Sequence, residues 1–192
     1  MPKRLFDTLR PYQDILVFVV ALLVANCFWK YTVHGDEAGY GDVTWFGLVL
    51  TPFFDMVAQQ VAQTVYALVA VVRDTVHLQG THLFFDSGNG SHIVWSCTPI
   101  KQSFIWLCLI LAARGPWVHK IWYIPAGWVV IYGINIVRIA AISLIIEHHP
   151  ELFEVMHTYV FKYVFYGLMF LMWLLWIECL VKHFTADSDT RA

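Results

Sequence analysis

The sequence predicts an all-α protein that crosses a membrane several times. We expect four to five transmembrane helices, an amphipathic segment and a short extracytoplasmic β-hairpin. Hydrophobic residues make up 59% of the 192 residues and charged residues 14%, and the mean hydropathy is +0.61. A soluble domain carries roughly 45–50% apolar and about 25% charged residues. The aromatic content of 17% supplies residues that anchor chains at bilayer interfaces.

The apolar segments follow one another as a single membrane domain, residues 1–192. A basic start precedes an apolar run, which we interpret as a retained first helix at about 14–33, because no small-residue cleavage site follows it. Residues 43–72 are amphipathic, so this segment lies along the interface, re-enters the membrane or lines a polar interior. Further apolar helices are predicted at about 98–113, 120–146 and 158–181.

Residues 82–97 change in character and predict a β-hairpin. Two short strand-like runs flank the turn Ser87-Gly-Asn-Gly90, where glycine and asparagine allow positive φ angles. Unpaired strand edges are not tolerated in hydrocarbon, so the hairpin lies at or above one membrane surface. The positive-inside rule places the N-terminus, the 114–120 turn and the C-terminal tail in the cytoplasm, and the hairpin outside. If 43–72 crosses the membrane once, the N-terminus must lie on the other side.

Charge and cysteine spacing exclude several other classes. The net charge is −2 and no run of Lys and Arg occurs, which leaves a nucleic-acid partner without an electrostatic footprint. The four cysteines show neither CxxC nor zinc-site spacing, which argues against a disulfide framework or a CxxC redox enzyme. We expect neither a cofactor nor a resident metal.

Arg138 is the most informative residue, because a guanidinium near the centre of a membrane helix costs about 2.5–3.5 kcal/mol. It lies roughly 25 Å along the helix from Ile121, toward the outer leaflet, and Asn135 shares its helix face. A functional charge would explain this cost. The simpler alternatives are an arginine that reaches the headgroups and a structural ion pair with Glu147.

Cys97 is the candidate nucleophile. It is expected to end the second hairpin strand and to open a helix at Thr98-Pro99, where the helix dipole favours a thiolate. The other cysteines, Cys27, Cys108 and Cys179, lie within hydrophobic helices and are interpreted as small apolar residues. A cysteine nucleophile needs a base within hydrogen-bond reach, and topology alone does not choose among the outer candidates His77, His82, His92, His148, His149 and His157.

A metal site is a competing interpretation of residues 147–157. This stretch contains Glu147, His148, His149, Glu151, Glu154 and His157. Di-iron helical sites use two Glu-x-x-His pairs and two further glutamates, whereas one such pair occurs here and Pro150 interrupts the helix. We therefore favour a solvated acidic loop.

Taken together, these motifs resemble the exosortase/archaeosortase family of prokaryotic multi-pass membrane cysteine transpeptidases. The resemblance covers roughly residues 52–181. It rests on Ser96-Cys97 before a helix, on Asn135-Ile-Val-Arg138-Ile after a basic turn, and on His157 before a Trp-rich last helix. Thr98-Pro99 departs from the small residue and glycine that commonly follow the family's cysteine. The chain resembles a compact bacterial form, because many members have extra N-terminal helices.

The resemblance implies a role for each residue of the candidate site. Cys97 would be the nucleophile, His157 the general base and later acid, and Arg138 the charge that stabilises the oxyanion or thiolate. The implied substrates are secreted proteins whose C-terminal tail carries a short motif, a transmembrane helix and a basic end. Cleavage would occur at the outer boundary of the bacterial inner membrane, and the acyl group would pass to an unknown acceptor.

Two alternatives stay open. The chain could be a non-enzymatic carrier or scaffold in which Arg138 binds an ion, or a metal-dependent membrane hydrolase that uses the 147–157 cluster. In every case membrane lipid is a partner and nucleic acid is not.

Overall fold

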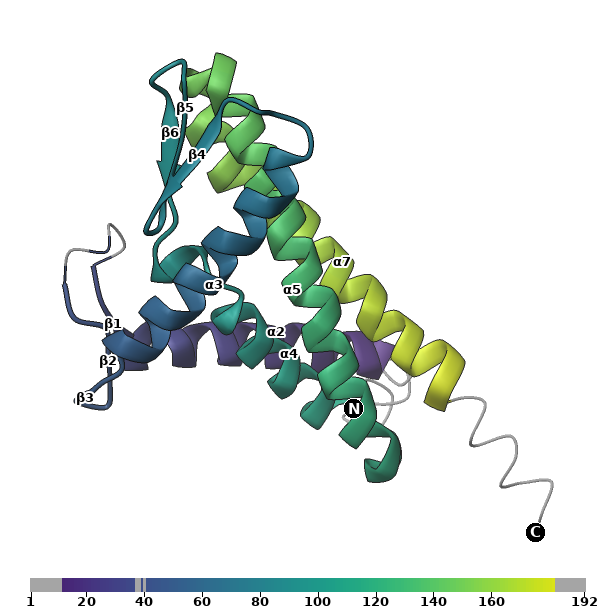
Figure 1. The fold of residues 1–192 in the computed structure, drawn as a ribbon. Helices are drawn as coiled ribbons and strands as arrows, with labels where there is room; N and C mark the ends of the chain where they lie inside the picture. The colour runs from purple at the N-terminus through teal and green to yellow at the C-terminus, as the bar shows by residue number, and fades with distance from the viewer. Residues whose placement is uncertain (1–11, 37–38, 40, 182–192) are drawn as a thin grey trace, which may run out of the picture.

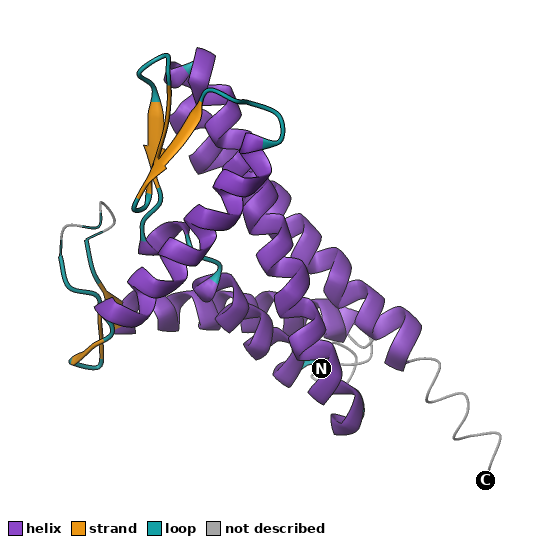
Figure 2. Cartoon of the chain, in the orientation of Figure 1, coloured by secondary structure: helices purple, strands orange, loops and turns teal. Residues whose placement is uncertain are grey.

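The computed structural model describes residues 12–36, 39 and 41–181. The side chains of residues 157, 158 and 179–181 lie outside this description. The described chain is mainly helical, with two small antiparallel sheets (Figure 2).

The elements follow the chain in a simple order. They are α2 (Gln13–Thr32), β1 (Val33–His34), β2 (Thr44–Trp45), β3 (Leu48–Val49), α3 (Thr51–Ala70), β4 (Val76–Gln79), β5 (His82–Phe85), β6 (Gly90–His92), a 3-10 turn (Trp95–Cys97), α4 (Ile100–Ala112), α5 (Trp117–His148), a 3-10 turn (Pro150–Leu152), α6 (Phe153–Val155), a π-helical turn (Met156–Val160), α7 (Phe161–Leu175) and a second π-helical turn (Trp176–Val181). Helix α5 is the longest, and α7 runs beside it (Figure 1).

Three of the described helices are long and apolar enough to cross a membrane. They are Gln13–Thr32, Trp117–His148 and Phe161–Glu178. The predicted class, a polytopic all-α membrane protein with a small β element, is therefore confirmed. Helix α4 is apolar but has only 13 residues, a length of about 20 Å against a hydrocarbon core of about 30 Å. The described part of the chain thus has three full-length spans and one short apolar helix.

Helix α5 is shared by two separate hydrophobic cores. Its N-terminal half, with Ile124 and Ile131, packs against α4 and α7 and shares one core with α2. Its C-terminal half, with Ile136 and Ile139, packs against α3 and the β4–β6 sheet. Figure 1 shows α3 and this sheet beside one end of α5, and α2 and α4 toward the other. Arg138 is carried by the stretch of α5 that follows the change from one core to the other.

The predicted hairpin is present as β5 and β6, and a third strand, β4, extends it to a three-stranded sheet. Strand β4 pairs with β5 and β5 with β6, all antiparallel, with His82 opposite His92. The second predicted strand ends at His92, and Cys97 closes a 3-10 turn before α4. Strand β4 was missed because the charged pair Arg73-Asp74 precedes it, although its residues alternate between buried Val76 and exposed His77.

A second sheet, β1–β3, was not predicted from the sequence. Its strands have two residues each, too short for a recognisable alternation. Phe46 and Gly47 link β2 to β3, both with positive φ, as a two-residue hairpin turn requires. The third core cluster, of Val33, Val43 and Phe54, lies next to this sheet.

The junction between α4 and α5 is held by buried polar contacts. Lys120 is 3% exposed, and its ammonium donates to the backbone oxygens of Leu111 (3.1 Å) and Ala113 (2.6 Å) at the end of α4. Further along α5, Gly127 lies against the fully buried indole of Trp106, which donates to the Ile124 carbonyl at 3.3 Å. The N-terminal half of α5 is thereby closely fitted to α4.

Candidate functional site

Three cavities meet at Arg138, which lines each of them. The side chain is partly buried, and its Nε is a buried donor without a partner among the described residues. The structural pair with Glu147 considered above is not formed. Glu147 is 7% exposed and accepts instead from Arg73 Nε at 3.1 Å. The guanidinium of Arg138 is therefore directed toward open volume in the protein.

Cys97 lies beside this guanidinium. The two residues line one cavity of about 440 Å³. Cys97 is partly buried. A sulfur and a guanidinium from segments about 40 residues apart are thus brought together at the start of α4 and the middle of α5.

Asn135 connects these two segments directly. Its Nδ2 donates to the Cys97 carbonyl oxygen at 2.9 Å, and the residue is fully buried. Asn135 precedes Arg138 by about one helical turn, so one face of α5 both holds the Cys97 backbone and presents the cation. The Oδ1 atom of Asn135 is buried without a hydrogen-bond partner among the described residues. An unsatisfied buried acceptor destabilises a folded protein, so its presence at Asn135 calls for a functional explanation.

The opposite wall of the Cys97 cavity is β6 and the turn before it. This wall is fixed to α5 by a bond between the hydroxyls of Ser91 and Ser143 (3.2 Å) and by Asn89 Nδ2, which donates to the Glu147 carbonyl (3.0 Å). The remaining lining comes from apolar α5 residues and from Pro150 and Phe153. The cavity therefore combines a polar end at Cys97 and Arg138 with an apolar floor.

His92 lines the same cavity and stacks on His82, with ring centroids 3.9 Å apart and planes at 10°. Burial, together with the charge of His82, lowers the pKa of His92 below its usual value of 6.5. His92 is consequently neutral near pH 7 and able to accept a proton. The sequence named His92 only as one of six candidates, because the register that turns it inward depends on strand pairing.

The predicted base, His157, lies in the π-helical turn Met156–Val160, and its side chain is outside the described residues. The remaining outer histidines whose side chains are described do not line the Cys97 cavity. His77 contacts Asp86 at 2.8 Å on the exposed face of the sheet, and His149 contacts Glu151 at 3.0 Å. His148 is exposed, 3.8 Å from Glu147.

The 147–157 cluster is not arranged as a metal site in the described part of the chain. No three His, Cys, Asp or Glu side chains there converge as metal ligands would. Glu147 is turned toward Arg73 and Thr75, whereas Glu151 pairs with His149. The other cysteines with described side chains lie elsewhere, Cys27 on α2 and Cys108 on α4 beside an apolar pocket.

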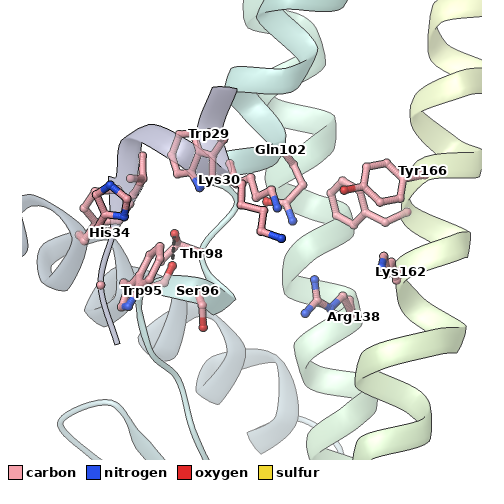
Figure 3. A pocket seen from close by; sticks show the side chains of 15 residues that line it. Trp29, Lys30, His34, Trp95, Ser96, Thr98, Gln102, Arg138, Lys162 and Tyr166 are labelled. Carbon is pink, nitrogen blue, oxygen red and sulfur yellow. Dashed lines mark hydrogen bonds between the residues drawn. The ribbon is translucent and has the colours of Figure 1, made fainter. Parts of the chain in front are cut away.

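A larger, polar cavity of about 730 Å³ lies on another side of Arg138 (Figure 3). Ser96 and Thr98, the neighbours of Cys97, line it, and Figure 3 shows Arg138 projecting from α5 toward them. A third cavity, of about 400 Å³, is an apolar groove between α5 and α7 that reaches Arg138 past Val137 and Phe161. No local sequence pattern indicates these cavities, since they form between helices distant in the chain.

Comparison with known proteins gives one family. The model of a family described as transmembrane exosortase matches residues 42–177, more than half of the chain. This range begins before α3 and includes Cys97, Asn135, Arg138 and His157. No curated protein and no solved structure matches the chain.

Proposed function

The chain belongs to the transmembrane exosortase family, and from this premise we propose that it is a membrane cysteine transpeptidase that cleaves the C-terminal sorting tails of secreted proteins. Cys97 is the nucleophile, Arg138 the stabilising cation and His157 the general base and acid. The observation that carries the proposal is the shared cavity of Cys97 and Arg138, with Asn135 holding the Cys97 backbone to the helix that presents the arginine.

The first step forms an acyl-enzyme. The sulfur of Cys97 attacks the scissile carbonyl carbon, and the thiol proton passes to the His157 imidazole. The oxyanion of the tetrahedral intermediate lies against the Arg138 guanidinium, where a fixed cation at low dielectric is worth several kcal/mol. Collapse breaks the C–N bond, His157 returns its proton to the leaving amine, and the tail departs with its new N-terminus.

The second step releases the acyl group. A hydroxyl or amine of the acceptor, or water, attacks the thioester and gives its proton to His157. The C–S bond then breaks, and His157 passes this proton to the leaving sulfur, which restores the thiol and the neutral imidazole. Pro99 does not supply a backbone N–H to the oxyanion. Arg138 therefore has the larger share of that stabilisation.

The surroundings of Arg138 support a substrate that arrives from the membrane. The apolar groove between α5 and α7 ends at Arg138, so an apolar tail segment in this groove would bring its extracytoplasmic end close to Cys97. The three apolar spans support a membrane protein. The positive-inside rule, applied to the basic 114–120 turn, supports an inner-membrane location with the opposite end of α5 outside. Its partners are lipid, the tailed substrate and an acceptor nucleophile.

Processing of a tailed substrate, co-expressed with the full chain and followed by mass shift, tests the proposal. Cys97→Ala, Arg138→Ala and His157→Ala are each expected to abolish processing while the protein still inserts in the membrane. Cys27→Ala and Cys108→Ala are matched controls that should process normally, because their sulfurs are remote from the cavity. Normal processing by Cys97→Ala would refute the mechanism.

Thiol alkylation separates the enzyme from a non-enzymatic carrier or scaffold. A nucleophilic Cys97 should be alkylated faster than Cys27, and this advantage should fall in Arg138→Gln, because the cation that shares the cavity with the sulfur is lost. If Cys97 is alkylated no faster than Cys27 and transport or binding depends on Arg138 alone, the carrier is the correct function.

A further inference from the structure

The polar cavity beside Arg138 is lined by positive charge from four helices. Its cationic lining residues are Lys30 of α2, Lys101 of α4, Arg138 of α5 and Lys162 of α7. Among the described residues that line it there is no carboxylate. Lys30, Arg138 and Lys162 share one opening and repel each other, so a bound anion would relieve this repulsion.

The N-terminal end of α4 adds to this positive potential. Thr98, Lys101 and Gln102 line the cavity at this end, and the first backbone bond into the helix is donated by Ser103 to the Pro99 carbonyl. The N–H groups before Ser103 therefore have no acceptor within the helix, and the helix dipole places partial positive charge there. Helix N-termini with this exposure bind phosphate and other anions.

The guanidinium of Arg138 projects into the cavity (Figure 3) and is a second group there that can bind an anion. No hydrogen bond or ion pair to another described residue engages this guanidinium. An arginine offers a planar set of donors that fits phosphate oxygens two at a time. A lysine such as Lys162 supplies a point charge to the same group.

The aromatic lining indicates the depth of the cavity. Trp29, Trp95 and Tyr166 lie at its wall, and side chains of this kind concentrate at the level of lipid headgroups. The cavity volume of about 730 Å³ is large enough for a headgroup. We propose that this cavity binds a phosphoryl group, as an anionic phospholipid headgroup or as free phosphate. The bound group would share Arg138 with the Cys97 cavity, but its binding does not rest on reactivity of the cysteine.

Calorimetric titration of the purified full chain in detergent tests the site, with short-chain phosphatidylglycerol and phosphatidylcholine as probes. The anionic lipid is expected to bind at least about ten-fold more tightly, because the choline cation of the other lipid is repelled. The double variant Lys30→Gln/Lys162→Gln should lose about ten-fold in affinity, and Lys30→Arg/Lys162→Arg should retain it, which separates lost charge from lost folding.

Arg114→Gln is the matched control, since it removes one cation at the opposite end of α4, where Arg114 pairs with Asp14 at 2.7 Å. It should bind as wild type. Competition distinguishes the two sources of the phosphoryl group: displacement of the lipid by millimolar inorganic phosphate identifies free phosphate as a ligand, and retention identifies the headgroup. Equal affinity for both lipids, wild-type binding by Lys30→Gln/Lys162→Gln, or equally effective displacement by acetate would overturn the proposal.

The same titration on Cys97→Ala keeps this inference separate from the proposed function. This variant lacks the nucleophile and should bind phosphatidylglycerol with wild-type affinity. If substrate processing is lost while phosphatidylglycerol binding is intact, the defect lies in the cysteine chemistry and the phosphoryl site stands. Loss of lipid discrimination in a chain that still processes its substrate refutes the phosphoryl site alone.

Discussion

Replacing Asn135 by alanine should loosen the attachment of Cys97 to α5. The structure gives three contributions to stability. The Nδ2–oxygen bond of 2.9 Å is worth about 1 kcal/mol, and the Cys97 carbonyl left without its donor costs about 1–3 kcal/mol more. Against this, the variant removes the buried Oδ1, which already lacks a partner, so part of the cost is offset. We expect a net loss of about 1–2 kcal/mol.

The effect on catalysis should exceed the effect on stability. A displacement of about 1 Å in a reacting group can cost about a hundred-fold in rate, so processing by Asn135→Ala should fall about ten- to a hundred-fold. Tyr132→Phe is the control. Tyr132 also lies on α5 but does not line the Cys97 cavity. The variant deletes the 2.9 Å hydrogen bond between the hydroxyls of Tyr132 and Thr64. Thermal unfolding in detergent should show a comparable loss of stability, with processing retained. If Asn135→Ala processes at the wild-type rate, the hydrogen bond does not position Cys97.

Gly127→Ala should destabilise the protein by about 1–3 kcal/mol or more, because an added Cβ would lie 2.7 Å from Cζ2 of the buried Trp106 indole and closer still to its Nε1. Gly133→Ala, with nothing within 4 Å of its added Cβ, should leave the melting temperature unchanged or raise it, and equal effects would contradict this packing. For His92, burial and His82 lower the pKa in the folded state, so the unfolded chain binds the proton more readily. This contribution to stability is complete above about pH 6.5 and is lost as the pH falls through the folded-state pKa. The melting temperature should therefore drop more in wild type than in His92→Gln between about pH 7.5 and about pH 5.5, and identical drops would show that His92 is not the group responsible.

The membrane class and the long helices can be predicted from the sequence, because hydropathy over some twenty residues is a local property. The pairing of Cys97 with Arg138 depends on contacts between distant segments, and composition points only to each residue separately. Arg138 stands out because lipid does not tolerate its charge, and Cys97 because it lies at a junction of elements.

The parts that were missed depend on tertiary contacts. Strand β4 is specified by its pairing with β5 and not by its own composition. The inward orientation of His92 follows from the register with His82, and a shift of one residue would reverse it. The cationic cavity draws Lys30 and Lys162 from α2 and α7, whose proximity no local pattern encodes.

The two ends of α4 are attached to α5 very differently. At the end near Lys120, a buried ammonium with two backbone acceptors fastens the helices together. At the other end, the Cys97 backbone is joined to α5 through the Asn135 amide. The two helices are therefore hinged at the loop after α4, and the hinge lies at the end far from the sulfur of Cys97 and the guanidinium of Arg138. A movement that admits a peptide is expected to separate Cys97 from Arg138 and to leave the Lys120 contacts intact.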